Sequence, residues 1–177
     1  MTAPQEWIVE GNAWKVGHNV NTESITPSRW LHEGPGPMRE HIAELLIPEF
    51  PKKVQEGDVW FAGTNLGCSS SRNASLYLKH AGIRAVVCQT AARVFYRNAV
   101  NSGLPVFEIG DAVADFRQGD RVQVNVRTGL IKNLTTGKIA QAKPFPPMIM
   151  DLLEAGGITG YIRTHAEKFP LLQVKPA

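Results

Sequence analysis

Short apolar runs alternate with helical patterns over the first 110 residues of the chain. Residues 58–63, 84–89 and 104–109 are apolar stretches with the length of buried strands. Between them, residues 73–81 and 91–102 are expected to form helices, each followed by a glycine that can end it. Strands and helices that alternate at this spacing predict a βαβαβ unit with parallel strands and right-handed crossovers.

The segments before this unit predict a strand, a polar loop and a helix. Residues 12–17 have the pattern of a short first strand, and the loop that follows carries several hydroxyl groups. Residues 38–46 place their apolar side chains on one helical face, and Pro48 is expected to end that helix. Further along, Thr90 is a candidate N-cap for the helix that starts at residue 91.

After Gly110 the pattern changes to an alternation of apolar and polar residues. Residues 120–143 alternate in this way around two Thr-Gly turns, which is typical of an antiparallel ribbon. Residues 146–156 predict a closing amphipathic helix. The predicted fold class is therefore α/β, with a parallel βαβαβ core, an antiparallel β ribbon and flanking helices. A length of 177 residues suits one domain, so we expect residues 1–177 to form a single domain.

Composition and charge narrow the functional classes. The chain is 43% hydrophobic and 20% charged, as expected for a soluble globular protein. Its start lacks the pattern of a signal peptide, and no apolar stretch approaches the roughly 20 residues of a membrane span, so we expect a cytoplasmic protein. The net charge of +3 comes from scattered basic residues. This dispersion disfavours nucleic acid as a partner and suits small anionic substrates.

The two cysteines argue against a metal centre held by this chain alone. Cys68 and Cys88 are not part of a CxxC motif or a Cys/His cluster. A structural zinc site or an iron–sulfur cluster normally needs three or four ligands. We therefore predict no metal-ligating residues in this sequence.

A turn rich in serine, "GCSSSR" from Gly67 to Arg72, carries the candidate chemistry. It lies where a parallel strand ends and a helix begins, so unpaired backbone N–H groups there favour an anion. Serine hydroxyls add donors, and the guanidinium of Arg72 matches a carboxylate. A serine in this positive field can also accept a proton. The alternative is a Gly/Ser-rich turn that only caps the helix.

The stretches "GCSSSRNAS" and "AGIRAVVCQTAARVFYRNAVNSGLPV", with the earlier "NVNTESITPSRWL", resemble a known family. It comprises the small subunits of isopropylmalate isomerase (3-isopropylmalate dehydratase) and the equivalent swivelling domain of aconitase. The similarity runs from about Trp14 to Arg163. The resemblance implies a swivelling-type domain and a reversible dehydration of a hydroxy acid.

Site residues follow from this resemblance. Ser70 matches the catalytic serine base of the family, and Ser71 and Arg72 match residues that hold substrate carboxylates. Glu23 falls where the family has an aspartate that faces the active site, which makes it a second catalytic candidate. The family also implies a [4Fe–4S] cluster with one open iron. Because this chain lacks the cysteines, the cluster is expected on a separate large subunit, with the active site between the two chains.

Several positions depart from the family pattern. Ser69 replaces the second glycine of the turn, which affects the φ angles that the turn can adopt. Asn73 and Ala74 replace a Glu-His pair, and the early loop has lost negative charge. The segment 28–38 occupies the substrate-selecting region, where Trp30-Leu31-His32 indicates a substrate tail other than isopropyl. These departures fit either a family branch with another substrate or a subunit with weakened catalysis.

The candidate substrate-binding residues are Ser69, Ser71, Arg72, Thr22, Trp30 and His32. Packing of Trp30 onto its own domain is the alternative to substrate contact, and an exposed His32 without a role is the alternative for that residue. The leading hypothesis is the small subunit of an iron–sulfur hydro-lyase that acts on a hydroxy di- or tricarboxylic acid. The alternatives are a non-catalytic carboxylate-binding or regulatory module and, third, an RNA-binding role.

Overall fold

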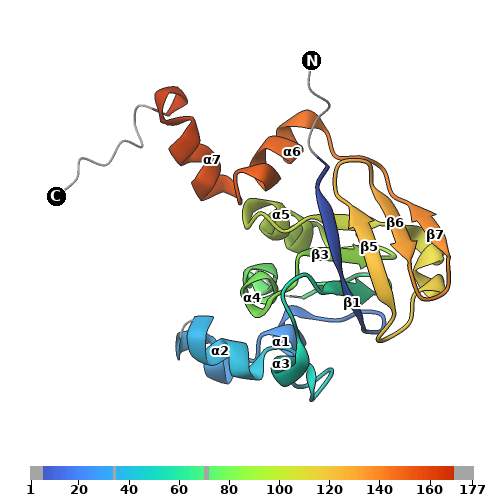
Figure 1. Ribbon diagram of the computed structural model, residues 1–177. Helices are drawn as coiled ribbons and strands as arrows, with labels where there is room; N and C mark the ends of the chain where they lie inside the picture. Colours follow the sequence, from blue (N-terminus) through green and yellow to red (C-terminus); the bar gives the residue numbers. More distant parts are fainter. Residues whose placement is uncertain (1–5, 34, 70–71, 170–177) are drawn as a thin grey trace.

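Strands of both orientations form one mixed sheet in the computed structural model, which describes residues 6–33, 35–69 and 72–169 (Figure 1). Its strand order is β4-β3-β2-β1-β5-β6-β7. The strands are β1 (Ile8–Lys15), β2 (Val59–Ala62), β3 (Ala85–Cys88), β4 (Val106–Glu108), β5 (Arg121–Asn125), β6 (Leu130–Asn133) and β7 (Ile139–Gln141). Strands β1 to β4 are mutually parallel, and β5 to β7 continue the sheet in antiparallel pairs.

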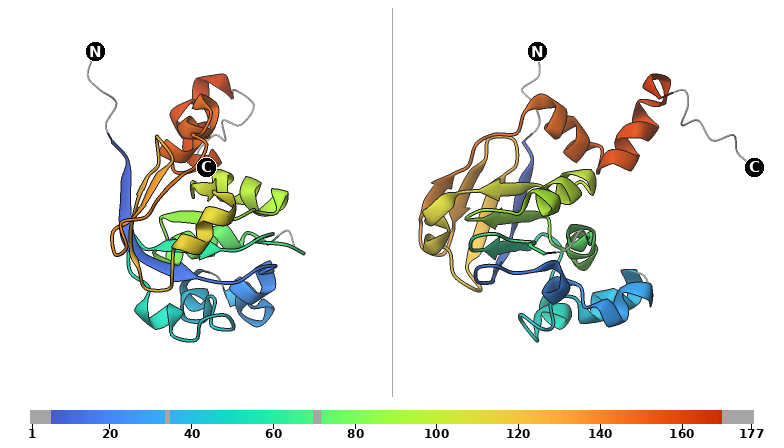
Figure 2. Two further views of the ribbon diagram at one scale, coloured as in Figure 1. Left: turned by 90° about the vertical axis from the view of Figure 1, so that its right-hand side faces the viewer. Right: turned by 180° about the vertical axis from the view of Figure 1, so that it is seen from behind.

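Strand β1 joins the two halves of the sheet. Its residues 13–15 pair with β2, whereas its residues 8–12 pair with β5. The buried carboxylate of Asp58 lies beside this change of partner and accepts hydrogen bonds from the Asn12 backbone N–H (2.8 Å), Trp14 Nε1 (2.7 Å) and the Gln55 backbone N–H (2.9 Å). The antiparallel strands then turn away from the parallel ones (Figure 2).

Helices surround this sheet, mainly beside its parallel half. They are α1 (Thr22–Ile25), α2 (Pro35–His41), α3 (Phe50–Lys53), α4 (Ala74–Ala81), α5 (Arg93–Asn101), α6 (Pro147–Glu154) and α7 (Ile158–Thr164), with 3₁₀ turns η1 (Ser28–Glu33), η2 (Gly110–Asp115) and η3 (Ala166–Lys168). Helix α7 projects from the body of the molecule (Figure 1). No helix in the described ranges has the length and apolarity needed to cross a membrane.

Two hydrophobic cores lie on opposite faces of the parallel strands. Neighbouring side chains of a strand point to opposite faces, so Trp60 and Phe61 of β2 enter different cores. Trp60 packs with Phe50 and with residues of α4 and α5, such as Leu78. Phe61 stacks on Phe116 inside the curled sheet, at a ring separation of 4.9 Å. This burial on both faces explains why the parallel strands appear in the sequence as continuous apolar runs.

The structure confirms the predicted α/β fold, with the βαβαβ unit at β2-α4-β3-α5-β4 and the ribbon at β5 to β7. Helix α4 ends at Gly82, which adopts φ 125° as expected of a glycine that ends a helix. The polar loop after β1 contains the short helix α1 and the turn η1, and α7 follows the helix that was expected to close the chain. Neither feature was predicted.

Two local predictions were wrong. The helix expected over residues 38–46 ends at His41, because Ala43 adopts φ 55° and its N–H donates to the carbonyl of Ile25 (2.8 Å). Thr90 does not cap the next helix, since α5 begins at Arg93. The Thr90 hydroxyl instead accepts a hydrogen bond from the backbone N–H of Asn65 (2.9 Å). In both cases a contact between distant segments overrides the local pattern.

Candidate active site

The loops after β1 and β2 lie side by side at the carboxyl ends of the parallel strands, which we call the carboxyl edge of the sheet. They lie together because the two strands are parallel neighbours and therefore end on the same side of the sheet. The loops are joined directly: the N–H of Gly67 donates to the carbonyl of Val20 (2.7 Å), and Asn21 forms a parallel bridge with Cys68. The first loop leads into α1 and the second leads into α4. Chemistry predicted for the two segments therefore comes together.

The turn after β2 uses left-handed backbone conformations at two positions. Gly67 has φ 76°, and a Cβ atom there would overlap the ring of Phe95. Ser69 has φ 75° and is exposed. Serine therefore adopts at this position the conformation that favours glycine, so its replacement of the family glycine keeps the turn at a cost of about 1–2 kcal/mol.

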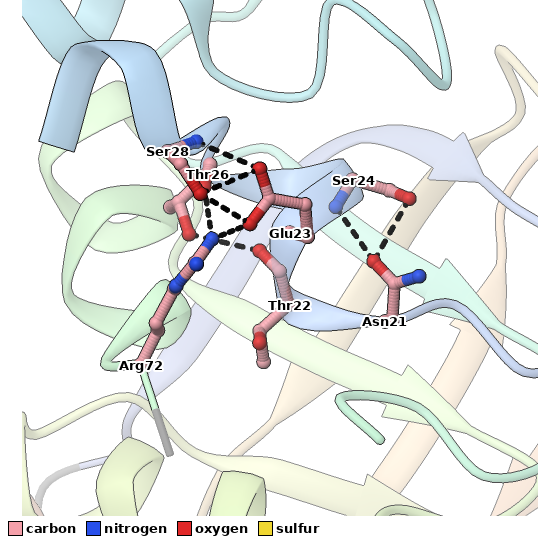
Figure 3. A network of polar contacts seen from close by, with 7 residues as sticks. All are labelled: Asn21, Thr22, Glu23, Ser24, Thr26, Ser28 and Arg72. Carbon is pink, nitrogen blue, oxygen red and sulfur yellow. Dashed lines mark hydrogen bonds and ion pairs between the residues drawn. The ribbon is translucent and has the colours of Figure 1, made fainter. Parts of the chain in front are cut away.

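Arg72 and Glu23 form an ion pair across the edge (Figure 3). An oxygen of the Glu23 carboxylate contacts Nη1 of Arg72. The same carboxylate accepts hydrogen bonds from the backbone N–H of Ser28 (2.9 Å) and from its hydroxyl (2.8 and 2.6 Å). Arg72 Nη1 also lies 3.5 Å from the carbonyl oxygen of Thr26. The structure thus brings two predicted site residues into direct contact.

Ser70 and Ser71, the predicted base and its neighbour, lie outside the described residues. The helix that follows them is capped by Asn73, whose side-chain oxygen accepts from the backbone N–H of Leu76 (3.3 Å) and the hydroxyl of Ser75 (2.7 Å). The Asn73 amide also donates to the hydroxyl of Ser102 (3.1 Å), at the end of α5. Asn73, noted in the sequence only as a departure from the family, therefore has a structural role.

The other predicted binding residues differ in their surroundings. Thr22 is buried, and among the described residues its hydroxyl has no hydrogen-bond partner. Trp30 stacks on His41 with ring centres 3.7 Å apart, which matches its packing alternative. His32 belongs to η1, but its side chain lies outside the described part of the structure. Of the predicted set, only Glu23 and Arg72 are in direct contact among the described residues.

Sequence reasoning missed Ser28 and Asn21. Ser28 binds the carboxylate of Glu23, whereas Asn21 caps α1 by accepting from the backbone N–H of Ser24 (2.8 Å). In Figure 3, Ser24 points toward Asn21 and away from Arg72. The loop pattern Asn-x-x-Ser before a short helix is the signal that could have identified the cap.

The cysteines do not provide a metal centre within the described ranges. No group of three or more His, Cys, Asp or Glu side chains there could hold a metal ion. Cys88 is buried, and this burial, with a smaller effect of Glu108, raises the pKa of its thiol to about 12. The Cys68 sulfur lies 3.5 Å from the carbonyl oxygen of Asn19. These residues do not fit an iron–sulfur cluster.

Comparison with known proteins identifies relatives along most of the chain. The aconitase C-terminal domain family matches residues 34–110. The isopropylmalate/citramalate isomerase small subunit of Methanocaldococcus jannaschii is 44% identical over 158 residues, which cover 88% of this chain and 94% of that protein. The 3-isopropylmalate dehydratase small subunit 1 of Thermotoga maritima is 39% identical over 166 residues, which cover 92% and 99%.

A solved structure agrees with these relatives. The crystal structure of a 3-isopropylmalate dehydratase from Methanocaldococcus jannaschii matches the present fold with a TM-score of 0.86 and 33% sequence identity, over 93% of this chain and 99% of that chain. In the present chain, the loops at the carboxyl ends of the parallel strands carry Glu23 and Arg72. The chain therefore belongs to the family of 3-isopropylmalate dehydratase small subunits, within the aconitase superfamily.

Proposed function

We propose that this protein is the small subunit of a two-chain hydro-lyase of the 3-isopropylmalate dehydratase type. The reaction is the reversible removal of water from a hydroxy di- or tricarboxylic acid. The names of relatives that are 39–44% identical support this class of reaction. One of these names contains both isopropylmalate and citramalate. We therefore propose a class of substrate, the hydroxy acids, and no single compound.

The observation that carries this proposal is the position of Arg72. Its guanidinium engages a carboxylate, that of Glu23, at the edge where the substrate is expected. Arg72 and Ser71 are assigned to bind a substrate carboxylate. Ser70 is assigned as the base that removes a proton from the carbon next to that carboxylate. The dipole of α4, whose first turn follows these residues, favours negative charge on the bound acid.

The partner is proposed to be a large aconitase-type subunit. The family implies an iron–sulfur cluster, and the described residues of this chain provide no ligand set for it. We assign the cluster to the large subunit, where it would polarise the leaving hydroxyl group of the substrate. Docking of that subunit over the carboxyl edge of the parallel strands would complete the active site and exclude water.

The non-catalytic alternative depended mainly on the replacement of Glu-His by Asn73 and Ala74. Capping of α4 by Asn73 gives this replacement a structural reason that does not involve loss of catalysis. No feature of the described residues favours a regulatory module over an enzyme. The enzyme is therefore the single function proposed.

The test replaces Ser70 by alanine in the complex with the proposed large subunit. A general base contributes about 10²–10⁴-fold, so Ser70→Ala is expected to lower kcat by this factor while the complex remains intact on size-exclusion chromatography. Ser24→Ala is the control, because Ser24 points away from Arg72 (Figure 3). Full turnover of the Ser70→Ala complex would reject the assignment of the base.

A further inference from the structure

The guanidinium assigned to the substrate already binds a carboxylate of its own chain. Arg72 contacts Glu23, whose side chain ends in the same chemical group as the proposed ligand. Building on the proposed role of Arg72, we propose that Glu23 is a displaceable stand-in for the substrate carboxylate. It neutralises Arg72 when no substrate is bound, and the substrate must take its place.

The contacts of Glu23 allow this exchange. Ser28 holds the carboxylate through its backbone N–H (2.9 Å) and its hydroxyl (2.8 and 2.6 Å), independently of Arg72. When Arg72 turns to a ligand, Glu23 keeps these bonds. Its side chain is 45% exposed, so water can solvate the oxygen that Arg72 leaves. The exchange therefore leaves no buried unpaired charge.

The charges predict the size of the effect. Arg72 is 27% exposed, and pairs near the surface are weak, so a substrate carboxylate can compete with Glu23. A ligand that binds only the fraction of molecules with Arg72 released has an apparent Kd raised in inverse proportion to that fraction. For a pair of this kind the expected penalty is about two- to fivefold in affinity. Glu23 is thus a residue that sets affinity, not a participant in proton transfer.

The experiment changes Glu23 in the assembled two-chain complex. Glu23→Gln keeps the shape and the acceptor for Ser28 but removes the charge that binds Arg72. It is expected to lower KM by about two- to fivefold and to leave kcat within twofold. Glu154→Gln is the matched control, because Glu154 pairs with Arg127 (2.8 Å), is 40% exposed, and lies in α6, outside the site.

A second variant separates displacement from simple repulsion of an anionic substrate by Glu23. Glu23→Asp keeps the negative charge but shortens the side chain by one methylene, so its reach to Arg72 is lost. Displacement predicts that Glu23→Asp resembles Glu23→Gln in KM. Repulsion alone predicts that Glu23→Asp resembles the unmodified chain, and that result would overturn the inference.

A binding measurement makes the inference independent of turnover. Succinate, a simple dicarboxylate, is titrated into the full-length small subunit alone and followed by NMR. Glu23→Gln is expected to bind succinate two- to fivefold more tightly than the unmodified chain, and Arg72→Met is expected to abolish binding. This readout stands even if Ser70→Ala shows that the proposed base is wrong.

The overturning outcomes are distinct from those of the proposed function. A kcat loss of more than tenfold in Glu23→Gln would place Glu23 in the chemistry and reject its role as a stand-in. Unchanged KM together with unchanged succinate affinity would show that the pair with Arg72 is permanent. Either result contradicts the inference while the assignment of Ser70 remains open to its own test.

Discussion

Ser69 illustrates how a single residue can keep a turn that its side chain disfavours. Its φ of 75° places the Cβ atom close to the following carbonyl oxygen, a conflict that glycine avoids. The neighbouring Gly67 and the bridge between Asn21 and Cys68 hold the turn in place. The strain therefore persists next to Arg72, where backbone N–H groups are expected to face an anion.

Replacement of this residue by glycine tests the strain. Ser69→Gly relieves about 1–2 kcal/mol of strain at a left-handed φ in the folded state. It also increases the conformational entropy of the unfolded chain, which stabilises the unfolded state by about 0.4–1 kcal/mol. The expected result is a net stabilisation of about 0.5–1 kcal/mol, or a Tm increase of about 1–4 °C in thermal unfolding. Ser69→Ala keeps the Cβ atom and serves as the control. An equal rise in Tm for Ser69→Ala would contradict the explanation.

At the scale of elements, helix α4 depends on its N-cap residue, Asn73, which directly follows the serine-rich turn. Asn73 accepts the N–H of Leu76 and donates to Ser102, so it both caps α4 and links it to α5. An acidic residue in the first turn also suits the helix dipole. Asparagine instead supplies a side-chain N–H group, which donates a hydrogen bond to the hydroxyl of Ser102. The departure from the family at this position thus exchanges a charge for a contact between two helices.

Removal of the cap is expected to destabilise the protein. Asn73→Ala should cost about 1–2 kcal/mol, measured by urea unfolding, because it removes the side-chain oxygen that accepts from the N–H of Leu76 and the hydroxyl of Ser75, and leaves Leu76 only the backbone carbonyl of Asn73. Asn73→Asp keeps the capping oxygen and is expected to lose less than half of that amount. A loss in Asn73→Asp as large as that in Asn73→Ala would assign the effect to the bond with Ser102 instead.

Elements with a strong local pattern could be predicted from the sequence, and elements set by distant contacts could not. The strands β2 and β3 are continuous apolar runs because both faces are buried, so they were predicted to within a residue or two. The end of α2 depends on the bond from Ala43 to Ile25, which no local pattern reveals. Helix α7 was not predicted because it is only seven residues long, contains Gly160 and directly follows Gly156 and Gly157, a pattern typical of a chain end or loop.

The candidate site shows the same division. The prediction that the turn at Arg72 binds an anion came from its strand-to-helix position and its residue types, whereas the roles expected for Ser70 and Glu23 came from resemblance to the family. The pair between Glu23 and Arg72 could not be predicted, because it requires two loops to meet through the parallel pairing of β1 and β2. Ser28 lies only five residues after Glu23, but its contact depends on the turn between α1 and η1, two elements that were not predicted.

At the scale of the whole molecule, the two halves of the sheet are joined at β1. The carboxylate of Asp58 is 1% exposed and accepts hydrogen bonds at the point where β1 changes its partner. Two of its donors, the N–H of Asn12 and the indole of Trp14, belong to β1 itself. Asp58 therefore fixes the register of the strand that both halves share.

Loss of this carboxylate is expected to destabilise the entire fold. Asp58→Ala removes the acceptor of four donors, the N–H and side-chain amide of Asn12, the indole of Trp14 and the N–H of Gln55, and we expect a loss of about 3–5 kcal/mol in the free energy of unfolding, measured with urea. Asp151→Ala, at an exposed position on α6, is the control and is expected to stay within about 0.5 kcal/mol. A loss below 1 kcal/mol for Asp58→Ala would contradict this role.

The sharing of β1 has a consequence for how the protein comes apart. If β1 detaches, β2 and β5 both lose the strand that they pair with. The backbone N–H and C=O groups on one side of each half of the sheet are then left without partners. Unfolding that starts in the antiparallel strands β5 to β7 is therefore expected to extend through β1 to the parallel strands packed against α4 and α5. The candidate active site at the carboxyl ends of β1 and β2 and the ribbon far from it are therefore expected to unfold in one cooperative step.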